Sequence, residues 1–81
     1  MEQQALNDSR EYGVQPFDAL MKEQGFDNHT VVVASPDHIT HKMVSKARNG
    51  RFLSVNVRRK VLTAFNIAAK TEYKLNDLFN Y

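Results

Sequence analysis

A run of 34 residues, from position 38 to position 71, constrains the fold of this chain more than any other feature. Its apolar residues repeat at helical spacing in two blocks, which Asn49-Gly50 separates. The run contains eight Lys or Arg residues and no Asp or Glu, whereas the rest of the chain contains three basic residues and all nine acidic ones. The net charge of +2 therefore combines +8 in this run with −6 elsewhere. Such segregation of charge is typical of a protein that binds a polyanion.

Length and composition predict one small domain. Eighty-one residues, 42% of them hydrophobic, allow a single core of modest size. The chain has no Cys, which excludes disulfides and thiolate metal sites. The first 12 residues lack the apolar segment of a secretory signal, and no apolar run approaches the length that spans a bilayer. We therefore expect a cytoplasmic protein with no membrane partner.

The expected fold is a compact all-α bundle of about five short helices, because the apolar segments repeat with the helical period. Residues 1–14 lack this pattern, so we expect a flexible arm over 1–14 and one domain over 15–81. Pro16 has the φ angle favoured at a first helical position, and Gly25 suits the residue just past a helix end. The first helix is therefore expected over about 16–24.

The second helix is expected over about 28–35, after several possible N-cap side chains from Asp27 onward. Val31, Val32 and Val33 would favour a strand by propensity, but the sequence indicates no second strand for pairing. A short buried helix is therefore the better interpretation.

The third helix has two candidate starts. Ser35-Pro36-Asp37 combines a Ser cap, a Pro at the first position and an acidic residue in the first turn, whereas Thr40 is a competing cap. In either case Asn49-Gly50 ends the helix. Its apolar face consists of Ile39, Met43, Val44 and Ala47.

Two more helices complete the chain. Ser54 is the expected cap of a helix that extends to about Ala69, and residues 74–80 are expected to form a short final helix. Three aromatic residues near the end are either core residues or an exposed patch for dimerisation. They are Tyr73, Phe79 and Tyr81.

Several residues stand, in order, at positions that one family of DNA-binding domains requires. Gly25-Phe26 precedes the second helix, and Val33-Ala34 lies within it, where an Ala lets the next helix approach closely. Ile39 and Thr40 supply an aliphatic residue and a cap before the third helix. The chain over about 16–80 therefore resembles the lambda-repressor/Cro-type helix-turn-helix family.

The resemblance continues from Ala34 to Gly50 without a gap. Further matching positions are Val44 and Ala47 in the third helix, Phe52-Leu53 in a hydrophobic loop, residues 61–67 in an amphipathic helix and residues 74–79 in a closing helix. His38 departs from the usual Gly of the turn, and Pro36 lies where the second helix normally continues. Arg48 replaces a common acidic residue, which is expected to make the third helix more basic.

The second helix has an alternative alignment with the family. The distance from Gly25 to Ala34 is longer than the family usually has. Matching Val31-Val32 in place of Val33-Ala34 would move the second helix back and lengthen the turn. Both alignments remain open at this point.

The resemblance implies a central helix-turn-helix whose third helix enters the major groove of double-stranded DNA, where the first residues of a recognition helix meet base edges. The candidate base-reading residues are Thr40, His41, Lys42, Ser45 and Lys46. The candidate phosphate-binding residues are Asn28, His29, Thr30, Asn49, Arg51 and Arg58. In these roles Lys42 and Lys46 would donate to guanine, whereas Thr40 and Ser45 could read either donors or acceptors.

The expected function is sequence-specific regulation of transcription, with repression by a homodimer bound to a two-fold operator. No enzyme activity, cofactor or small-molecule effector is implied. Two alternatives are a helix-turn-helix fold that docks an acidic protein partner and a non-specific binder of RNA or DNA. A metal site at His38 and His41 is not expected, because only Asp37 and His29 lie near them as further ligands. Ser35, Asp37 and His38 are too close together in the chain to form a catalytic triad.

Overall fold

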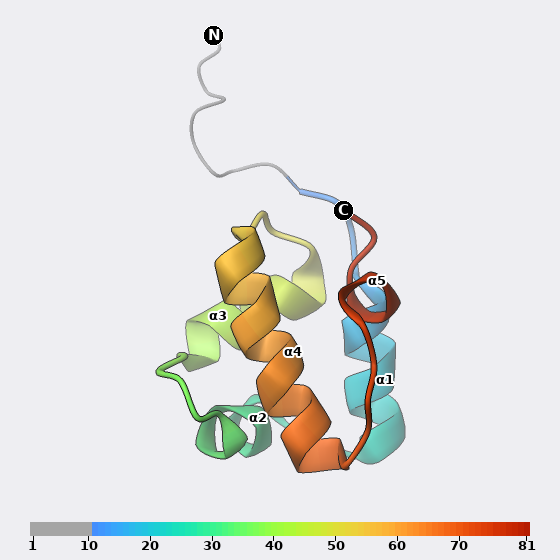
Figure 1. Ribbon diagram of the computed structural model, residues 1–81. Coiled ribbons are helices and arrows are strands. Elements are labelled where there is room, and N and C mark those ends of the chain that lie inside the picture. Colours follow the sequence, from blue (N-terminus) through green and yellow to red (C-terminus); the bar gives the residue numbers. More distant parts are fainter. Residues whose placement is uncertain (1–10) are drawn as a thin grey trace, which may run out of the picture.

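In a computed structural model, which describes residues 11–81, the chain folds into five helices (Figure 1). They are α1 (Pro16–Gln24), α2 (Asn28–Ala34), α3 (His41–Asn49), α4 (Val55–Ala69) and α5 (Leu75–Leu78). The longest helix, α4, contacts α2, α3 and α5, while α1 contacts α3 and α5. The described residues contain no strand beyond an isolated bridge between Glu11 and Arg51. The prediction of an all-α bundle is confirmed.

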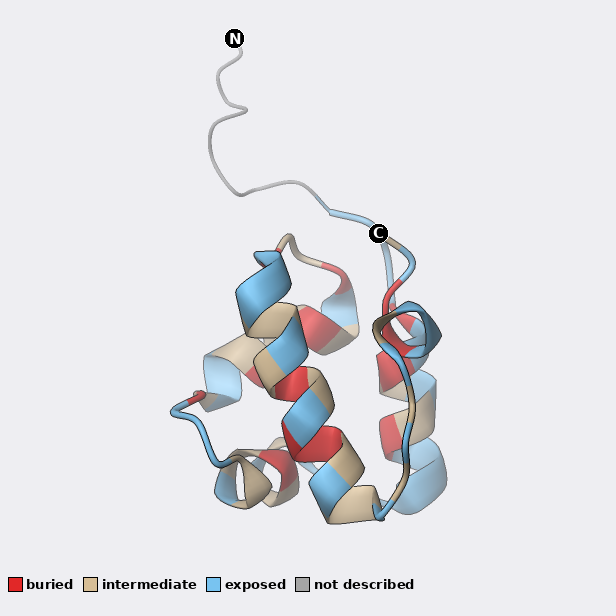
Figure 2. Cartoon of the chain, in the orientation of Figure 1, coloured by how far each residue is buried: buried red, intermediate tan, exposed pale blue. Residues whose placement is uncertain are grey.

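Every helix contributes at least one side chain to a single core, and the buried faces turn toward one another (Figure 2). Phe17 and Phe65 meet edge to face, with ring centroids 5.6 Å apart, and Phe26 also meets Phe65 edge to face, with centroids 5.9 Å apart. Edge-to-face contacts add to the stabilisation that burial of these large rings provides. The fully buried aliphatic residues around them are Met21, Val31, Val44, Ala47, Val61, Ala64 and Leu78.

The helix ends follow the local signals of the sequence. Pro16 occupies the first turn of α1, and Gly25 ends it at φ 70°. The Thr40 hydroxyl accepts a hydrogen bond from the Met43 N–H at the start of α3, and the Ser54 hydroxyl accepts one from Val57 at the start of α4. Each cap satisfies a backbone donor that has no acceptor inside its helix.

The burial pattern of α2 shows which of its valines faces the core. Val31 is fully buried against the core, whereas Val33 is 65% exposed. Residues two apart on a helix point about 200° apart, so only one of the two side chains can face inward. In α2 it is therefore Val31 that faces the core, while Val33 faces outward.

The connection between α2 and α3 runs over residues 35–40. The Ser35 hydroxyl accepts a hydrogen bond from the Asp37 N–H (3.1 Å) and donates one to the Asp37 carbonyl (2.6 Å), which holds Pro36 in a bend outside any helix. Ile39, 3% exposed, anchors the loop in the core. Of the two candidate starts, α3 uses Thr40. The connection is longer than the usual helix-turn-helix turn of three to four residues.

The segment before α1 is attached to the domain, in contrast to the expected arm. The Tyr12 N–H donates to the Gly50 carbonyl (2.8 Å), and the Gln15 N–H donates to the Arg48 carbonyl (3.0 Å). The Gln15 side chain is 1% exposed and joins both ends of the domain, because its Oε1 accepts from Asn80 (2.7 Å) and its Nε2 donates to Gly13 (2.9 Å). The rest of the expected arm, residues 1–10, lies outside the described residues.

The last residues turn back onto the domain instead of extending α5 to position 80. Phe79 has an extended backbone and is 3% exposed. The Tyr81 hydroxyl accepts from the Leu53 N–H (3.1 Å) and donates to the Arg51 carbonyl (3.2 Å), and its ring stacks on Tyr12 with centroids 4.2 Å apart. These aromatic residues therefore pack within the domain.

Candidate nucleic-acid interface

The two sides of α3 are chemically opposite. Val44 and Ala47 are fully buried against the core. The other side carries five of the predicted DNA-contacting residues, with three exposed (His41, Lys42 and Asn49) and two half-buried (Ser45 and Lys46). The fold therefore brings these five polar side chains together on one helix, with no acidic residue among them.

Lys42 and Lys46 have no acidic partner. Neither ammonium lies within ion-pair distance of a carboxylate anywhere in residues 11–81. Their charges are therefore not compensated by the described part of the protein, so an anionic ligand could interact with both.

Arg48, which the sequence placed on the basic face, is instead neutralised by α1. Its Nε donates to Asp18 Oδ1 at 2.5 Å, and both side chains are largely buried, with 21% and 14% of their surface exposed. Lys22, one turn beyond Asp18, lies 3.2 Å from the other carboxylate oxygen. Burial would raise the pKa of Asp18, but the hydrogen bonds from Arg48 and Lys22 hold the pKa below its usual value. The expectation that Arg48 makes the face of α3 more basic is wrong.

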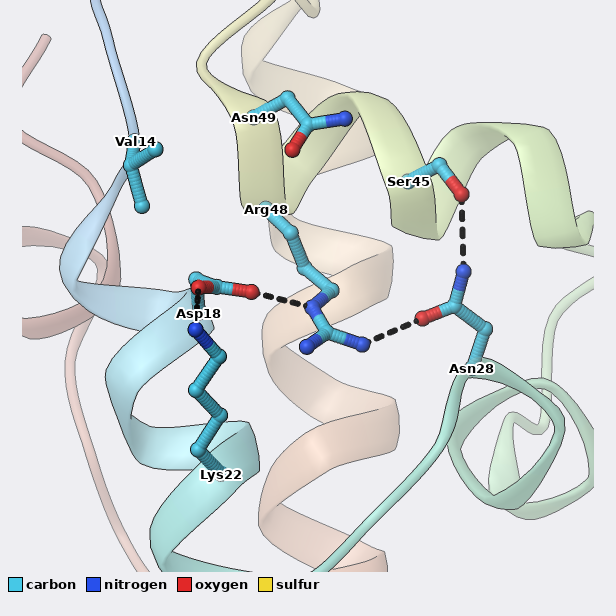
Figure 3. A pocket seen from close by; sticks show the side chains of 7 residues that line it. All are labelled: Val14, Asp18, Lys22, Asn28, Ser45, Arg48 and Asn49. Atoms are coloured by element: carbon cyan, nitrogen blue, oxygen red, sulfur yellow. Dashed lines mark hydrogen bonds and ion pairs between the residues drawn. The ribbon is translucent and has the colours of Figure 1, made fainter.

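A chain of hydrogen bonds continues from Arg48 to the middle of α3 (Figure 3). Arg48 Nη1 donates to Asn28 Oδ1 at 2.9 Å, and Asn28 Nδ2 donates to Ser45 Oγ at 2.8 Å. Asn28 is the first residue of α2, so these bonds join α1, α2 and α3. Both ends of the Asn28 amide are thus occupied by protein groups, although the sequence suggested a phosphate contact.

These side chains line a recess of about 410 Å³ between α1, α2 and α3 (Figure 3). Both oxygens of Asp18 are engaged by cations, and Asn28 Oδ1 is engaged by Arg48. The Lys22 and Asn49 side chains, both exposed, also line this recess. The residues lining the recess are Val14, Asp18, Lys22, Asn28, Ser45, Arg48 and Asn49.

The other predicted residues of α2 behave differently from each other. His29 is exposed, and its ring stacks on that of His41 with centroids 5.6 Å apart, so the starts of α2 and α3 lie side by side. Thr30, in contrast, donates from both its N–H and its hydroxyl to Asp27 Oδ1 (3.0 and 2.9 Å). The backbone hydrogen bond from Thr30 also lowers the pKa of Asp27. Thr30 thus contributes to a helix cap, and His29 is the more available of the two.

The two arginines predicted to bind phosphate have unequal freedom. Arg51 is 43% exposed, and its Nε lies 3.8 Å from Glu11 Oε2 without a hydrogen-bond partner in the described residues. Arg58 donates to the Tyr81 carbonyl (2.5 Å) and to the Leu53 carbonyl (3.1 Å), and its guanidinium lies 4.4 Å from the centre of the Tyr81 ring. Arg58 therefore holds the end of the chain against α4, while Arg51 remains accessible.

No family model, curated protein or solved structure matched this chain in comparisons of sequence and fold. Within residues 11–81, no three His, Cys, Asp or Glu side chains lie close enough together to hold a metal ion. None of the helices in this range is both long and apolar enough to cross a membrane. The chemistry of the α3 surface is therefore the best indication of function.

Proposed function

We propose that this protein is a sequence-specific regulator of transcription that binds double-stranded DNA with α3 in the major groove. The observation that carries the proposal is the acid-free polar side of α3, on which Lys42 and Lys46 have no carboxylate partner in residues 11–81. The opposite side is fixed to the core by Val44 and Ala47, so the helix can be presented as a rigid unit.

The size of α3 suits this role. Nine residues form a helix about 14 Å long, with a diameter of about 10 Å including side chains. A B-DNA major groove is about 12 Å wide and admits one such helix. His41 and Lys42 occupy the first turn, which meets base edges in helix-turn-helix complexes, and Ser45 and Lys46 follow one turn later.

Phosphate contacts would flank the recognition helix. Arg51 follows the end of α3 and Asn49 lies in its last turn, so both are suited to one DNA strand. His29 lies beside His41 at the other end, where it would meet a phosphate across the groove. Contacts of this kind set the position of the protein and make binding sensitive to salt. Repression would follow from occlusion of the promoter by a homodimer on a two-fold operator.

Selection of bound fragments from a random pool of double-stranded DNA tests this proposal directly. The wild-type protein is expected to enrich one sequence motif, and that motif should be retained when the selection is repeated at higher salt. The variant Lys42→Gln/Lys46→Gln should lose the motif. The matched control Lys70→Gln/Lys74→Gln removes the same charge beyond the end of α4 and should keep it.

The outcomes separate the alternatives. Retention of all fragments at low salt and of none at high salt would indicate non-specific binding to nucleic acid. No retention at either salt concentration, from a protein that is folded by circular dichroism, would refute DNA binding and leave an acidic protein partner as the better explanation for the basic face.

A further inference from the structure

We infer that Asn28 and Arg48 set the hydrogen-bonding polarity of Ser45, so that Ser45 acts as a donor to an acceptor atom of a DNA base. The inference rests on the proposed function, and it adds two positioning residues that do not themselves touch the base. It also narrows the role of Ser45, which the sequence left open between donor and acceptor.

The orientation of the Asn28 amide is fixed by Arg48. A guanidinium can only donate hydrogen bonds, so the Asn28 atom 2.9 Å from Arg48 Nη1 must be the amide oxygen. The two ends of an amide are otherwise hard to distinguish. The remaining end, Nδ2, therefore faces Ser45 Oγ at 2.8 Å and must donate to it.

The hydrogen bond from Asn28 determines which donor and acceptor positions of the Ser45 hydroxyl remain for DNA. A Ser hydroxyl has one hydrogen and two acceptor positions, and Asn28 occupies one acceptor position. No acceptor within residues 11–81 takes the hydroxyl hydrogen. A hydroxyl that accepts one hydrogen bond becomes a better donor in the next, because hydrogen bonds in a chain polarise one another. Ser45 is thus prepared to donate toward guanine O6 or N7, adenine N7 or thymine O4.

The side chains that form this series of hydrogen bonds are also held in place by α1. Arg48 is held by Asp18 of α1 at 2.5 Å, and the two side chains are 21% and 14% exposed. Asn28 is therefore held between Arg48 and Ser45, and both of these lie on α3 itself. Because the hydrogen bond that reaches the Ser45 hydroxyl comes from an amide held in this way, Asn28 keeps one acceptor position of the hydroxyl occupied and leaves its hydrogen for another acceptor.

The sharpest test reverses the direction of the hydrogen bond between Asn28 and Ser45. In Asn28→Asp, the carboxylate would still accept from Arg48, but its second oxygen could only accept from Ser45. The Ser45 hydrogen would then point inward, and only lone pairs would face the DNA. Selection from a random DNA pool is expected to show a changed preference at one base pair, from an acceptor atom to an adenine or cytosine amino group. The change should be roughly five- to tenfold, the discrimination that a single hydrogen bond provides.

Two further variants complete the experiment. Ser45→Ala should remove the preference at that same base pair and leave the rest of the motif unchanged, and the double variant Asn28→Asp/Ser45→Ala should behave like Ser45→Ala alone. Asn28→Ala should weaken the preference there without reversing it. A merely structural role of Asn28 would lower affinity for all sequences and would not change one base.

The results distinguish failure of this inference from failure of the proposed function. If the wild-type protein enriches no motif, the proposed function fails. If the wild-type motif appears but Ser45→Ala leaves every position of it unchanged, the inference is overturned. It is also overturned if Asn28→Asp folds normally and selects the wild-type motif. Should Asn28→Asp not fold, the comparison of Ser45→Ala with the wild type still decides.

Discussion

Asp18 in α1 and Arg48 in α3, 30 residues apart in the chain, are joined by a hydrogen bond of 2.5 Å from Arg48 Nε to Asp18 Oδ1. Both side chains are mostly buried, and Arg48 passes the connection on to Asn28 in α2. The orientation of α3, the proposed recognition helix, therefore depends on the carboxylate of Asp18 in α1.

Asp18→Asn is expected to lower the free energy of unfolding by about 1–2 kcal/mol at neutral pH, since Arg48 would lose a charged acceptor. The pKa of Asp18 is depressed in the folded protein, so its contribution is present above the unfolded-state value of about 3.9 and is lost as the pH falls through the folded-state value. Urea denaturation between neutral and acidic pH should show the difference from wild type shrinking below about pH 4. Asp37→Asn, at an exposed carboxylate without an ion pair in residues 11–81, is the control and should show no such difference.

The register of α2 can be tested with two identical substitutions. Val31→Ala removes a fully buried side chain and should lower the free energy of unfolding by about 2 kcal/mol. Val33→Ala removes a side chain that is 65% exposed, and its effect should lie within about 0.5 kcal/mol of zero. Thermal and urea denaturation of both variants would measure the difference, and equal effects would contradict the orientation of the helix.

Substitutions of Arg58 and of Tyr81, which it contacts, test whether Arg58 has a structural role or contacts DNA. Arg58→Ala should lower stability by about 1–3 kcal/mol, because Arg58 bonds two backbone carbonyls and stacks on Tyr81. Tyr81→Phe should cost about 1 kcal/mol, since it leaves the Leu53 N–H without its acceptor. DNA affinity of the folded Arg58→Ala protein should stay close to wild type. A large loss of affinity at full stability would instead support the phosphate contact predicted from the sequence.

Lys42 and Arg51 should have different effects on DNA binding. Lys42→Ala is expected to change the preferred sequence, with a loss of about 1–3 kcal/mol on the best site. Arg51→Ala should weaken binding to all sequences about equally and reduce the slope of log affinity against log salt by about one. Glu11→Gln, which removes the carboxylate 3.8 Å from Arg51, should strengthen binding slightly. Titrations at several salt concentrations would reveal whether the two basic residues behave alike, in which case the division of roles is wrong.

Two glycines with similar backbone angles provide a test of the segment before α1. Gly50 (φ 84°) and Gly25 (φ 70°) both end helices, but a Cβ on Gly50 would lie 1.7 Å from the Gly13 carbonyl oxygen, whereas a Cβ on Gly25 would meet nothing within 4 Å. Gly25→Ala should cost about 1 kcal/mol from backbone strain alone. Gly50→Ala should cost more and should speed hydrogen exchange at the Tyr12 amide, because the segment must move away. Equal effects on both readouts would show that the contact is not maintained in solution.

Most helix boundaries could be predicted because their signals are local, although Thr40 was one of two candidate starts and α5 ends before position 80. Pro16, Gly25, Thr40, Ser54 and Gly50 each act within one turn of their own position, so the sequence around them is sufficient. The orientation of α2 could not be predicted in the same way. Three consecutive valines contain no periodicity, and only packing against α4 determines that Val31 faces inward.

The parts of the candidate site that were missed depend on contacts between distant segments. The charge of Arg48 suggests a residue exposed on the surface, and no residue within one helical turn of it indicates that Asp18 is its partner. Attachment of residues 11–15 was also missed, because it relies on backbone hydrogen bonds and on the buried Gln15, which leave no apolar pattern in the sequence. The position of His41, Lys42 and Lys46 on the polar side of α3 could be predicted, because charge and helical spacing are both visible in the sequence.

The hydrogen-bond chain from Asp18 to Ser45 has a consequence for how this protein can change over evolution. Each of its four side chains is matched in donors and acceptors to the next, so a change at one position leaves an unpaired group at its neighbour. Positions 18, 28, 45 and 48 should therefore vary together among related sequences, while Lys42 and Lys46 should vary independently of them. Such a lineage could acquire a new operator more readily through its lysines than through Ser45, whose replacement would leave the Asn28 amide N–H without its acceptor.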